Sequence, residues 1–140
     1  MAQHFTCFLI DDDSDDREIF AMALEDADKL CKCITAKSGI DALQILNADQ
    51  TFAPDYIFLD LNMPLLPGTK CLMEIKQIPR LVDTPVIIYT TSSHEKDIEE
   101  SKRLGAAHFL VKAPGLKSLT QMLSAIFRKQ TLPFYLNPEV

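Results

Sequence analysis

Five aspartates occupy the six positions 11–16, directly after an apolar run of the sequence. Carboxylates packed so closely repel one another, and proton uptake or a bound cation relieves that repulsion. A simpler role is at the start of a helix, where each well-placed acidic residue gains roughly 0.3–1 kcal/mol from the helix dipole. We assign that role to Asp13, Asp15 and Asp16, and we treat Asp11 and Asp12 as candidate cation ligands.

Three further side chains suited to the same chemistry follow later apolar runs: Asp60, Thr90 and Lys112. Taken singly, Thr90 would be an ordinary strand residue and Lys112 a surface lysine. Carboxylate oxygens that leave ligand positions to water suit Mg²⁺. Beside such a cation, a hydroxyl group and an ammonium can hold the charge of a transferring phosphoryl group. Asp60 can then act as the nucleophile and form an aspartyl phosphate.

The elements that must position these residues alternate along the chain. Apolar runs at 5–10, 31–36, 56–59, 86–90 and 107–111 predict five buried strands. Amphipathic or polar segments between and after them predict helices, the first at about 14–30 and the last at about 116–129. This alternation predicts an α/β fold, a doubly wound parallel sheet with helices on both faces. In such sheets the functional site lies at the carboxyl ends of the strands, where the five candidate side chains converge.

Composition and charge argue against DNA binding and against insertion into a membrane. A chain of 140 residues with a formal net charge of −6 and scattered Lys and Arg fits one globular domain that does not bind DNA. We find no secretory signal and no apolar run long enough for a membrane span, so we expect a cytoplasmic protein that does not enter a membrane. The four cysteines are then expected to be reduced and structural: Cys7, Cys31, Cys33 and Cys71.

Four motifs occur in a specific order: "LIDDD", "PDYIFLDLNMP" with Gly68 after it, "TPVIIYTTS" and "LGAAHFLVK". With them the chain resembles the receiver domain of two-component response regulators. It is most similar to stand-alone receivers that partner bacterial phytochromes. The resemblance implies a flavodoxin-like five-stranded sheet of order 2-1-3-4-5. The receiver domain would span residues 4–130, and residues 131–140 would form a C-terminal tail.

The resemblance also implies a Mg²⁺ site around the phosphoacceptor, Asp60. Asp12 would coordinate the metal with Asp60, and Asp11 would act through a metal-bound water. Asn62 would supply a backbone carbonyl. These roles come from the family and not from the spacing of the residues.

Two other implied roles concern the switch between resting and phosphorylated states. Thr90 would move to hydrogen-bond a phosphoryl oxygen, while Lys112 would pair with another. Phe109 stands where the family often has a tyrosine, so we expect a packing switch coupled to Thr90. The sequence departs from the family at Ala113, because proline usually follows the lysine directly through a cis bond. A cis bond to alanine would cost about 3–4 kcal/mol, so the loop is either strained or takes another path.

The implied function is that of a single-domain response regulator, which is not an enzyme beyond catalysing its own phosphorylation and dephosphorylation. Its phosphodonor would be a sensor histidine kinase or a phosphotransfer protein. Its output would reach an unidentified downstream protein through the fourth helix, fifth strand and fifth helix. The apolar tail would either extend a homodimer surface or cover the domain.

Two other classes of protein remain as alternatives. An aspartyl-nucleophile, Mg²⁺-dependent phosphatase would typically have a second aspartate two residues beyond the nucleophile, and Asn62 stands there instead. Asparagine cannot transfer the proton that this acid supplies. A flavodoxin-like cofactor binder would need a phosphate-binding Gly or Ser/Thr loop after the first strand, where this chain has aspartates.

Overall fold

The computed structural model describes residues 4–138, in which strands and helices alternate. The strands are β1 (Phe5–Ile10), β2 (Cys31–Ala36), β3 (Tyr56–Leu59), β4 (Val86–Thr90), β5 (His108–Val111) and β6 (Tyr135–Leu136). The helices are α1 (Ser14–Ala27), α2 (Gly39–Ala48), α3 (Gly68–Lys76), the 3₁₀ turn η1 (Pro79–Leu81), α4 (Glu95–Arg103) and α5 (Leu116–Phe127). None of the helices within this part of the chain has the length and apolar character needed to span a bilayer.

All strand pairs are parallel, in the order β2-β1-β3-β4-β5-β6. The order 2-1-3-4-5 predicted for the first five strands is confirmed. The sixth strand was not predicted, because two residues are too few to show a strand pattern in the sequence. It forms because Leu136 pairs with Leu110, and the Phe109 N–H donates a hydrogen bond of 2.8 Å to the Phe134 carbonyl.

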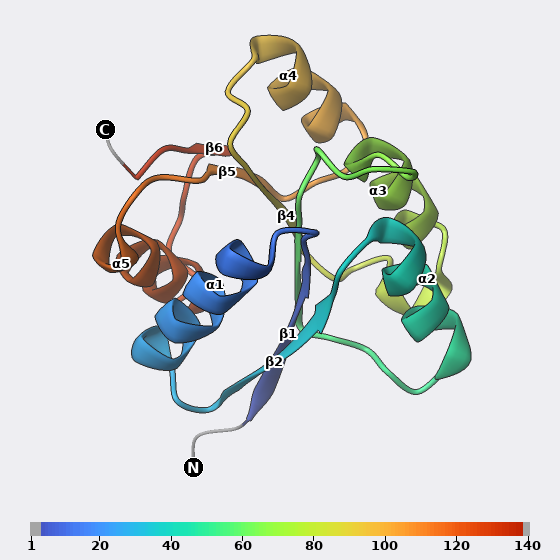
Figure 1. Ribbon diagram of the computed structural model, residues 1–140, viewed down its shortest axis with the longest axis horizontal. Helices are drawn as coiled ribbons and strands as arrows, with labels where there is room; N and C mark the ends of the chain where they lie inside the picture. The colour runs from blue at the N-terminus through green and yellow to red at the C-terminus, as the bar shows by residue number, and fades with distance from the viewer. Residues whose placement is uncertain (1–3, 139–140) are drawn as a thin grey trace.

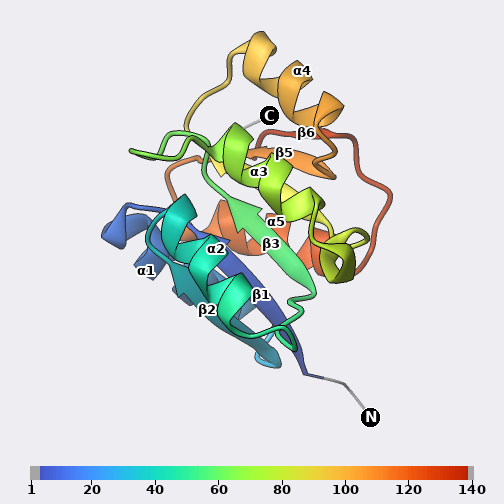
Figure 2. The same ribbon diagram turned by 90° about the vertical axis from the view of Figure 1, so that its right-hand side faces the viewer.

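The helices lie in two layers, one on each face of the sheet (Figures 1 and 2). α1 and α5 lie side by side on one face, over a core that includes Phe20, Phe58 and Leu123. α2 and α3 cover the other face together with α4, over a core that includes Phe8 and Phe109. All five residues of β4 are buried, as expected for a central strand covered on both sides.

Two helices end earlier than the sequence predicts. α1 ends at Ala27 and not near position 30. Asp28 caps the helix, and the Asp28 N–H donates a hydrogen bond to the Leu24 carbonyl. The Asp28 side chain then accepts a hydrogen bond from the Leu30 N–H at 2.9 Å, which holds the turn into β2. Likewise α5 stops at Phe127, and Lys129 has a positive φ of 55° that a continuing helix would not allow.

The predicted tail is part of the body of the domain, as far as residue 138. Leu136 is 3% exposed and belongs to the core under α1 and α5. Phe134 packs against the core of the opposite face, and the Lys102 ammonium lies 5.7 Å from the centre of its ring. Of the two roles predicted for the tail, covering the domain is the one that these contacts support.

Candidate functional site

Three aspartates meet at the carboxyl edge of the sheet. Asp11 and Asp12 follow β1, and Asp60 follows the neighbouring β3, where its N–H donates a hydrogen bond of 3.0 Å to the Ile10 carbonyl. Asp11 is fully buried, Asp60 is 6% exposed and Asp12 is exposed. One carboxylate oxygen from each lies within 4.8 Å of the other two. Such a set of hard oxygen ligands fits a divalent cation.

Lys112 contacts two of these aspartates. Its Nζ lies 2.8 Å from Asp11 Oδ2, 3.4 Å from Asp60 Oδ2 and 2.8 Å from Asp16 Oδ2. The Lys112 side chain is 9% exposed, and its ammonium lies 5.2 Å from the centre of the Tyr89 ring. One nearly buried ammonium therefore neutralises only part of the charge of several carboxylates. The site keeps a net negative charge, which attracts a cation.

The pKa shifts of the site have a common origin in burial and excess negative charge. Burial raises the pKa of Asp11 above 3.8, against the opposing effect of its hydrogen bond to Lys112. Burial alone would lower the pKa of Lys112, but hydrogen bonds to Asp11 and Asp16 and the charge of Asp60 outweigh it and raise that pKa. Lys112 therefore keeps its charge throughout the physiological range.

Asp16 is a site residue that the sequence analysis missed. We assigned it to the start of a helix together with Asp13 and Asp15, and the structure supports that role for Asp13, whose side chain accepts from the N–H groups of the other two. Asp15 and Asp16 lie in the first turn of α1, as predicted, and Asp16 also holds Lys112. The sequence did contain a signal, because Asp16 lies four residues before the buried Phe20 and so on the inner face of α1.

Thr90 and Asn62 complete the edge next to Asp60. Thr90 is fully buried, and its Oγ1 lies 3.4 Å from Asn62 Nδ2 as acceptor of a long hydrogen bond. The Asn62 N–H donates to Asp60 Oδ1 at 3.2 Å, which orients the carboxylate. The structure thus brings together the predicted side chains. The role of the Asn62 carbonyl as a metal ligand stays a prediction.

The loop after Asp60 is held by a close approach of backbone at Gly68. The Gly68 N–H donates to the Leu61 carbonyl at 2.9 Å. A Cβ at position 68 would lie 2.3 Å from the Asp60 carbonyl oxygen and 2.5 Å from Leu61 Cα. Only glycine allows this packing, which fixes the backbone on which Asp60 stands.

The loop after Lys112 differs from the cis arrangement usual in the resembled family. Residues 4–138 contain no cis peptide bond, so the chain from Lys112 to Pro114 takes another path. Gly115 follows with a φ of 108° and directly precedes α5. A positive φ of this size suits glycine, which therefore makes the turn that directs the chain into the helix.

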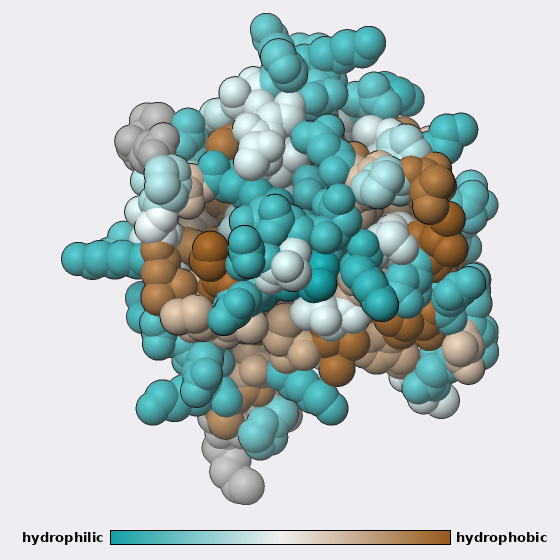
Figure 3. Space-filling view, viewed as in Figure 1, coloured by the Kyte–Doolittle hydropathy of each residue, from teal (hydrophilic) through white to brown (hydrophobic). Residues whose placement is uncertain are grey.

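A hollow of about 500 Å³ opens beside the site, between α1 and the loop before α5. Lys112 and Asp16 lie at one end of it, and the exposed apolar side chains of Ile19 and Met22 line it. Apolar surface shows between α1 and α5 in Figure 3, among hydrophilic surroundings, whereas the surface of α4 is mainly hydrophilic. We call this hollow the α1 groove.

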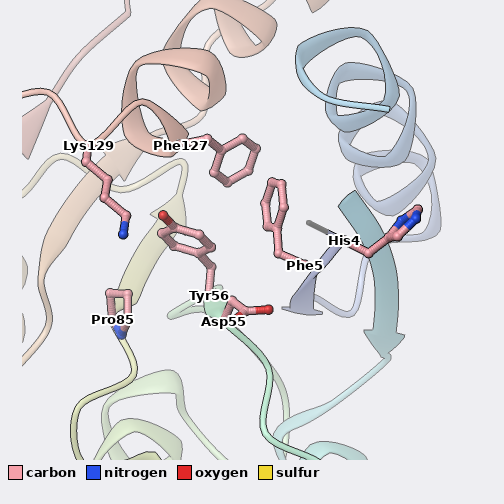
Figure 4. A pocket seen from close by; sticks show the side chains of 7 residues that line it. All are labelled: His4, Phe5, Asp55, Tyr56, Pro85, Phe127 and Lys129. Atoms are coloured by element: carbon pink, nitrogen blue, oxygen red, sulfur yellow. The ribbon is translucent and has the colours of Figure 1, made fainter. Parts of the chain in front are cut away.

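A second hollow, of about 390 Å³, lies at the opposite edge of the sheet (Figure 4). Phe5, Tyr56 and Phe127 point toward one another there, and the Phe127 ring centre lies 5.0 Å from that of Phe5 and 5.1 Å from that of Tyr56. Asp55, the acidic residue of this hollow, accepts a hydrogen bond from the Thr6 N–H at 2.8 Å. Among the described residues that line this hollow, Asp55 is the one that carries a carboxylate, so the hollow lacks the set of three that meets at the carboxyl edge.

Comparisons with known proteins match one family over most of the chain. The family model described as "Response regulator receiver domain" matches residues 7–124. Response regulator Rcp1 of Synechocystis sp. is 32% identical over 122 residues, which cover 84% of this chain and 83% of Rcp1. Other relatives are longer proteins, and the chain spans 26–61% of their length.

Solved structures show the same fold. The crystal structure of the phosphorylated cyanobacterial phytochrome response regulator RcpA superposes with a TM-score of 0.81 at 31% identity, covering 93% of this chain and 99% of RcpA. The Mn²⁺-bound form of Rcp1 superposes with a TM-score of 0.78 at 30% identity, covering 93% of this chain and 98% of Rcp1.

Proposed function

This chain belongs to the family of response regulator receiver domains, and we propose on that premise that Asp60 is its phosphoacceptor. The chain is a module of phosphorylation-dependent signalling. One observation supports Asp60 more than any other. Its carboxylate contacts Lys112 and accepts a hydrogen bond from the Asn62 N–H, and the Asn62 side-chain amide donates in turn to the Thr90 hydroxyl. The Asp60 carboxylate, as nucleophile, is therefore surrounded by the candidate cation ligands and by the groups that can stabilise phosphoryl charge.

In the proposed reaction an Asp60 oxygen attacks the phosphorus of a phosphohistidine. The new O–P bond forms as the N–P bond breaks, and the electron pair of that bond stays with the imidazole nitrogen. Lys112 pairs with one phosphoryl oxygen, and the Thr90 hydroxyl donates to another. Asp11, Asp12, Asp60 and the carbonyl of Asn62 would hold Mg²⁺, which when bound neutralises charge on the phosphoryl oxygens.

Phosphorylation then changes the packing on one face of the sheet. Thr90 and Phe109 lie on neighbouring strands, and the register that pairs Thr90 with Val111 and Ile88 with Phe109 points both side chains to the same face. When the Thr90 hydroxyl turns from Asn62 to the phosphoryl group, the contacts around the buried Phe109 ring change. The surface of α4, β5 and α5 carries that change to a downstream protein. A single Phe109 rotamer in resting and phosphorylated structures, with a changed α4 surface, would contradict this coupling.

The phosphodonor is a sensor histidine kinase or a phosphotransfer protein, and the α1 groove supports its docking beside Asp60. Ile19 and Met22 are 43% and 50% exposed there, although both are apolar. An exposed apolar surface of this kind suits a protein partner. Self-association as a homodimer and a cytoplasmic location stay predictions from the sequence.

Intact mass spectrometry after incubation with acetyl phosphate and Mg²⁺ tests the proposal. We expect one phosphoryl adduct on the native chain and none on Asp60→Asn. Asp55→Asn is the matched control, since Asp55 directly precedes β3 as Asp60 directly follows it, and this variant should take up one phosphoryl group.

Two results would overturn the assignment. An adduct that persists in Asp60→Asn would place the phosphoacceptor elsewhere. Steady, multiple-turnover release of phosphate from small phosphate esters would favour the phosphatase, whereas we propose that the chain catalyses only its own phosphorylation and dephosphorylation.

A further inference from the structure

Three thiols gather on β1 and β2, away from the carboxyl edge. Cys7 of β1 pairs in register with Cys33 of β2, and Cys31 lies two residues before Cys33, so all three side chains point to the same face of the sheet. They belong to or pack against the core under α1 and α5. The Sγ atoms of Cys7 and Cys31 lie only 3.2 Å apart.

This cluster is arranged as a pair and not around a common centre. Within residues 4–138, the group of three or more metal-ligating side chains with atoms in mutual reach is the aspartate cluster, and the thiols do not form another. A thiophilic metal would require several sulfur ligands around one point. The close approach therefore favours chemistry between two sulfur atoms.

The pair can be reached from solvent on one side. A hollow of about 350 Å³ is lined by Cys31 and Cys33 together with Glu25 and Lys29. Cys31 is partly exposed in it, while Cys7 is fully buried behind. A small oxidant can therefore contact the Cys31 sulfur first, with the Cys7 sulfur already in place to respond.

We propose that Cys31 and Cys7 form a reversible disulfide when peroxide enters this hollow. The Cys31 thiolate attacks a peroxide oxygen, the O–O bond breaks, and protonation of the leaving oxygen gives water and a sulfenic acid. The Cys7 sulfur then attacks the Cys31 sulfur, and the proton of Cys7 leaves with the departing hydroxyl group as a second water. Two thiols and one hydrogen peroxide thus give one disulfide and two waters.

The surroundings of the other thiols favour this order of events. The hydrogen bond with Cys31, and then burial, raise the pKa of Cys7, so Cys7 is not the thiol that reacts first with peroxide. Burial raises the pKa of Cys33 to about 11, which makes it a poor first nucleophile. The bond itself needs the sulfur atoms to move from 3.2 Å to about 2.05 Å, a shift of about 1.2 Å.

Peptide mapping after mild peroxide treatment tests the inference. We expect the mass of the native chain to fall by that of two hydrogen atoms and to return to its starting value with dithiothreitol. Digestion of the oxidised chain should yield a linked pair of peptides that contains Cys7 and Cys31. Cys31→Ser and Cys7→Ala should each abolish the linked pair. Cys33→Ser and Cys71→Ser should retain it, and circular dichroism of every variant checks that the fold is kept.

Other products would refute the pairing. A bridge between Cys31 and Cys33, a bridge between two chains, or sulfinic and sulfonic acids on Cys31 without any bridge would each exclude it. The inference does not depend on the proposed phosphorylation, because the readout is the linked peptide. Asp60→Asn should therefore form the bridge as the native chain does.

Discussion

The Nζ atom of Lys112 lies 2.8 Å from Oδ2 of Asp11, a residue 101 positions earlier in the chain. The two residues follow β5 and β1, which are separated in the sheet by β3 and β4, so the long lysine side chain spans the carboxyl edge. This ion pair, with the contacts to Asp16 and Asp60, holds the acidic site together. It also makes the stability of the fold depend on what neutralises the aspartates.

Replacing Lys112 should therefore destabilise the fold in a way that Mg²⁺ reverses. Lys112→Ala removes the ammonium that pairs with the buried Asp11 and leaves it only the hydrogen bond from the Asp13 N–H. The loss should be about 3 kcal/mol in urea unfolding without divalent cation. Added Mg²⁺ should restore much of that loss because it binds the folded state only. Phosphorylation by acetyl phosphate should nevertheless stay at least tenfold slower. Lys117→Ala, at an exposed position of α5, is the control and should change neither quantity. Equal unfolding free energies with and without Mg²⁺ in Lys112→Ala would contradict the prediction.

Gly68→Ala should impair the site without touching any of its side chains. The added Cβ would meet backbone atoms of Asp60 and Leu61 at 2.3 and 2.5 Å, so the loop must move. We expect a loss of roughly 2–4 kcal/mol in unfolding free energy, as for other overpacked or strained sites. Phosphorylation should fall several-fold. Gly39→Ala is the matched control, since the atoms nearest to its Cβ would belong to the Leu66 side chain, the first at 2.9 Å, and a side chain can give way where backbone cannot. Similar effects of the two substitutions would show that the close backbone approach is unimportant.

A charge introduced into the α1 groove should slow phosphoryl transfer from a protein donor but not from a small-molecule donor. Ile19→Glu places a carboxylate on the apolar wall beside Asp16, where a protein partner would have to bury it. Transfer from a phosphorylated histidine protein should drop at least tenfold, while transfer from acetyl phosphate should stay within twofold of the native rate. Val82→Glu changes an apolar residue that is 57% exposed and lies outside the groove, and it should leave both rates unchanged. Equal losses with both donors in Ile19→Glu would mean that the substitution disturbs the site itself.

Tyr89 should make the fold less stable in alkali. Burial raises its pKa from 10.0 to about 12, although the nearby Lys112 opposes the shift. Between these values the unfolded chain releases the phenolic proton more readily, so the free energy of unfolding falls as pH rises and levels off above the folded pKa. The total loss is about 3 kcal/mol. Urea unfolding at a series of pH values should show a shallower decline in Tyr89→Phe. The control, Tyr135→Phe at a position that is 36% exposed, should decline as the native chain does.

The features that could be predicted from the sequence are those that a pattern of several residues marks, namely the strands and the polar residues at their ends. Five apolar runs located five strands, and polar residues at their ends located Asp11, Asp60 and Lys112 on one edge. The contact of Asp16 with Lys112 was missed because an aspartate at this position also suits the start of a helix. Only its spacing of four residues from the buried Phe20 indicates that it faces inward. β6 was missed because what holds it is a pairing with β5, formed by residues that lie far apart in the chain.

The sixth strand sets a practical limit on where this domain can be cut. A shortened chain that ends after α5, at Phe127, would keep the five predicted strands, helices α1 to α5 and every residue of the acidic site. It would also remove Leu136 from the core and leave the Phe109 N–H without its carbonyl partner. A chimera that borrows this receiver should therefore carry the chain at least through Leu136, because a graft designed on the five-strand pattern would expose the edge of β5 to pairing with other chains.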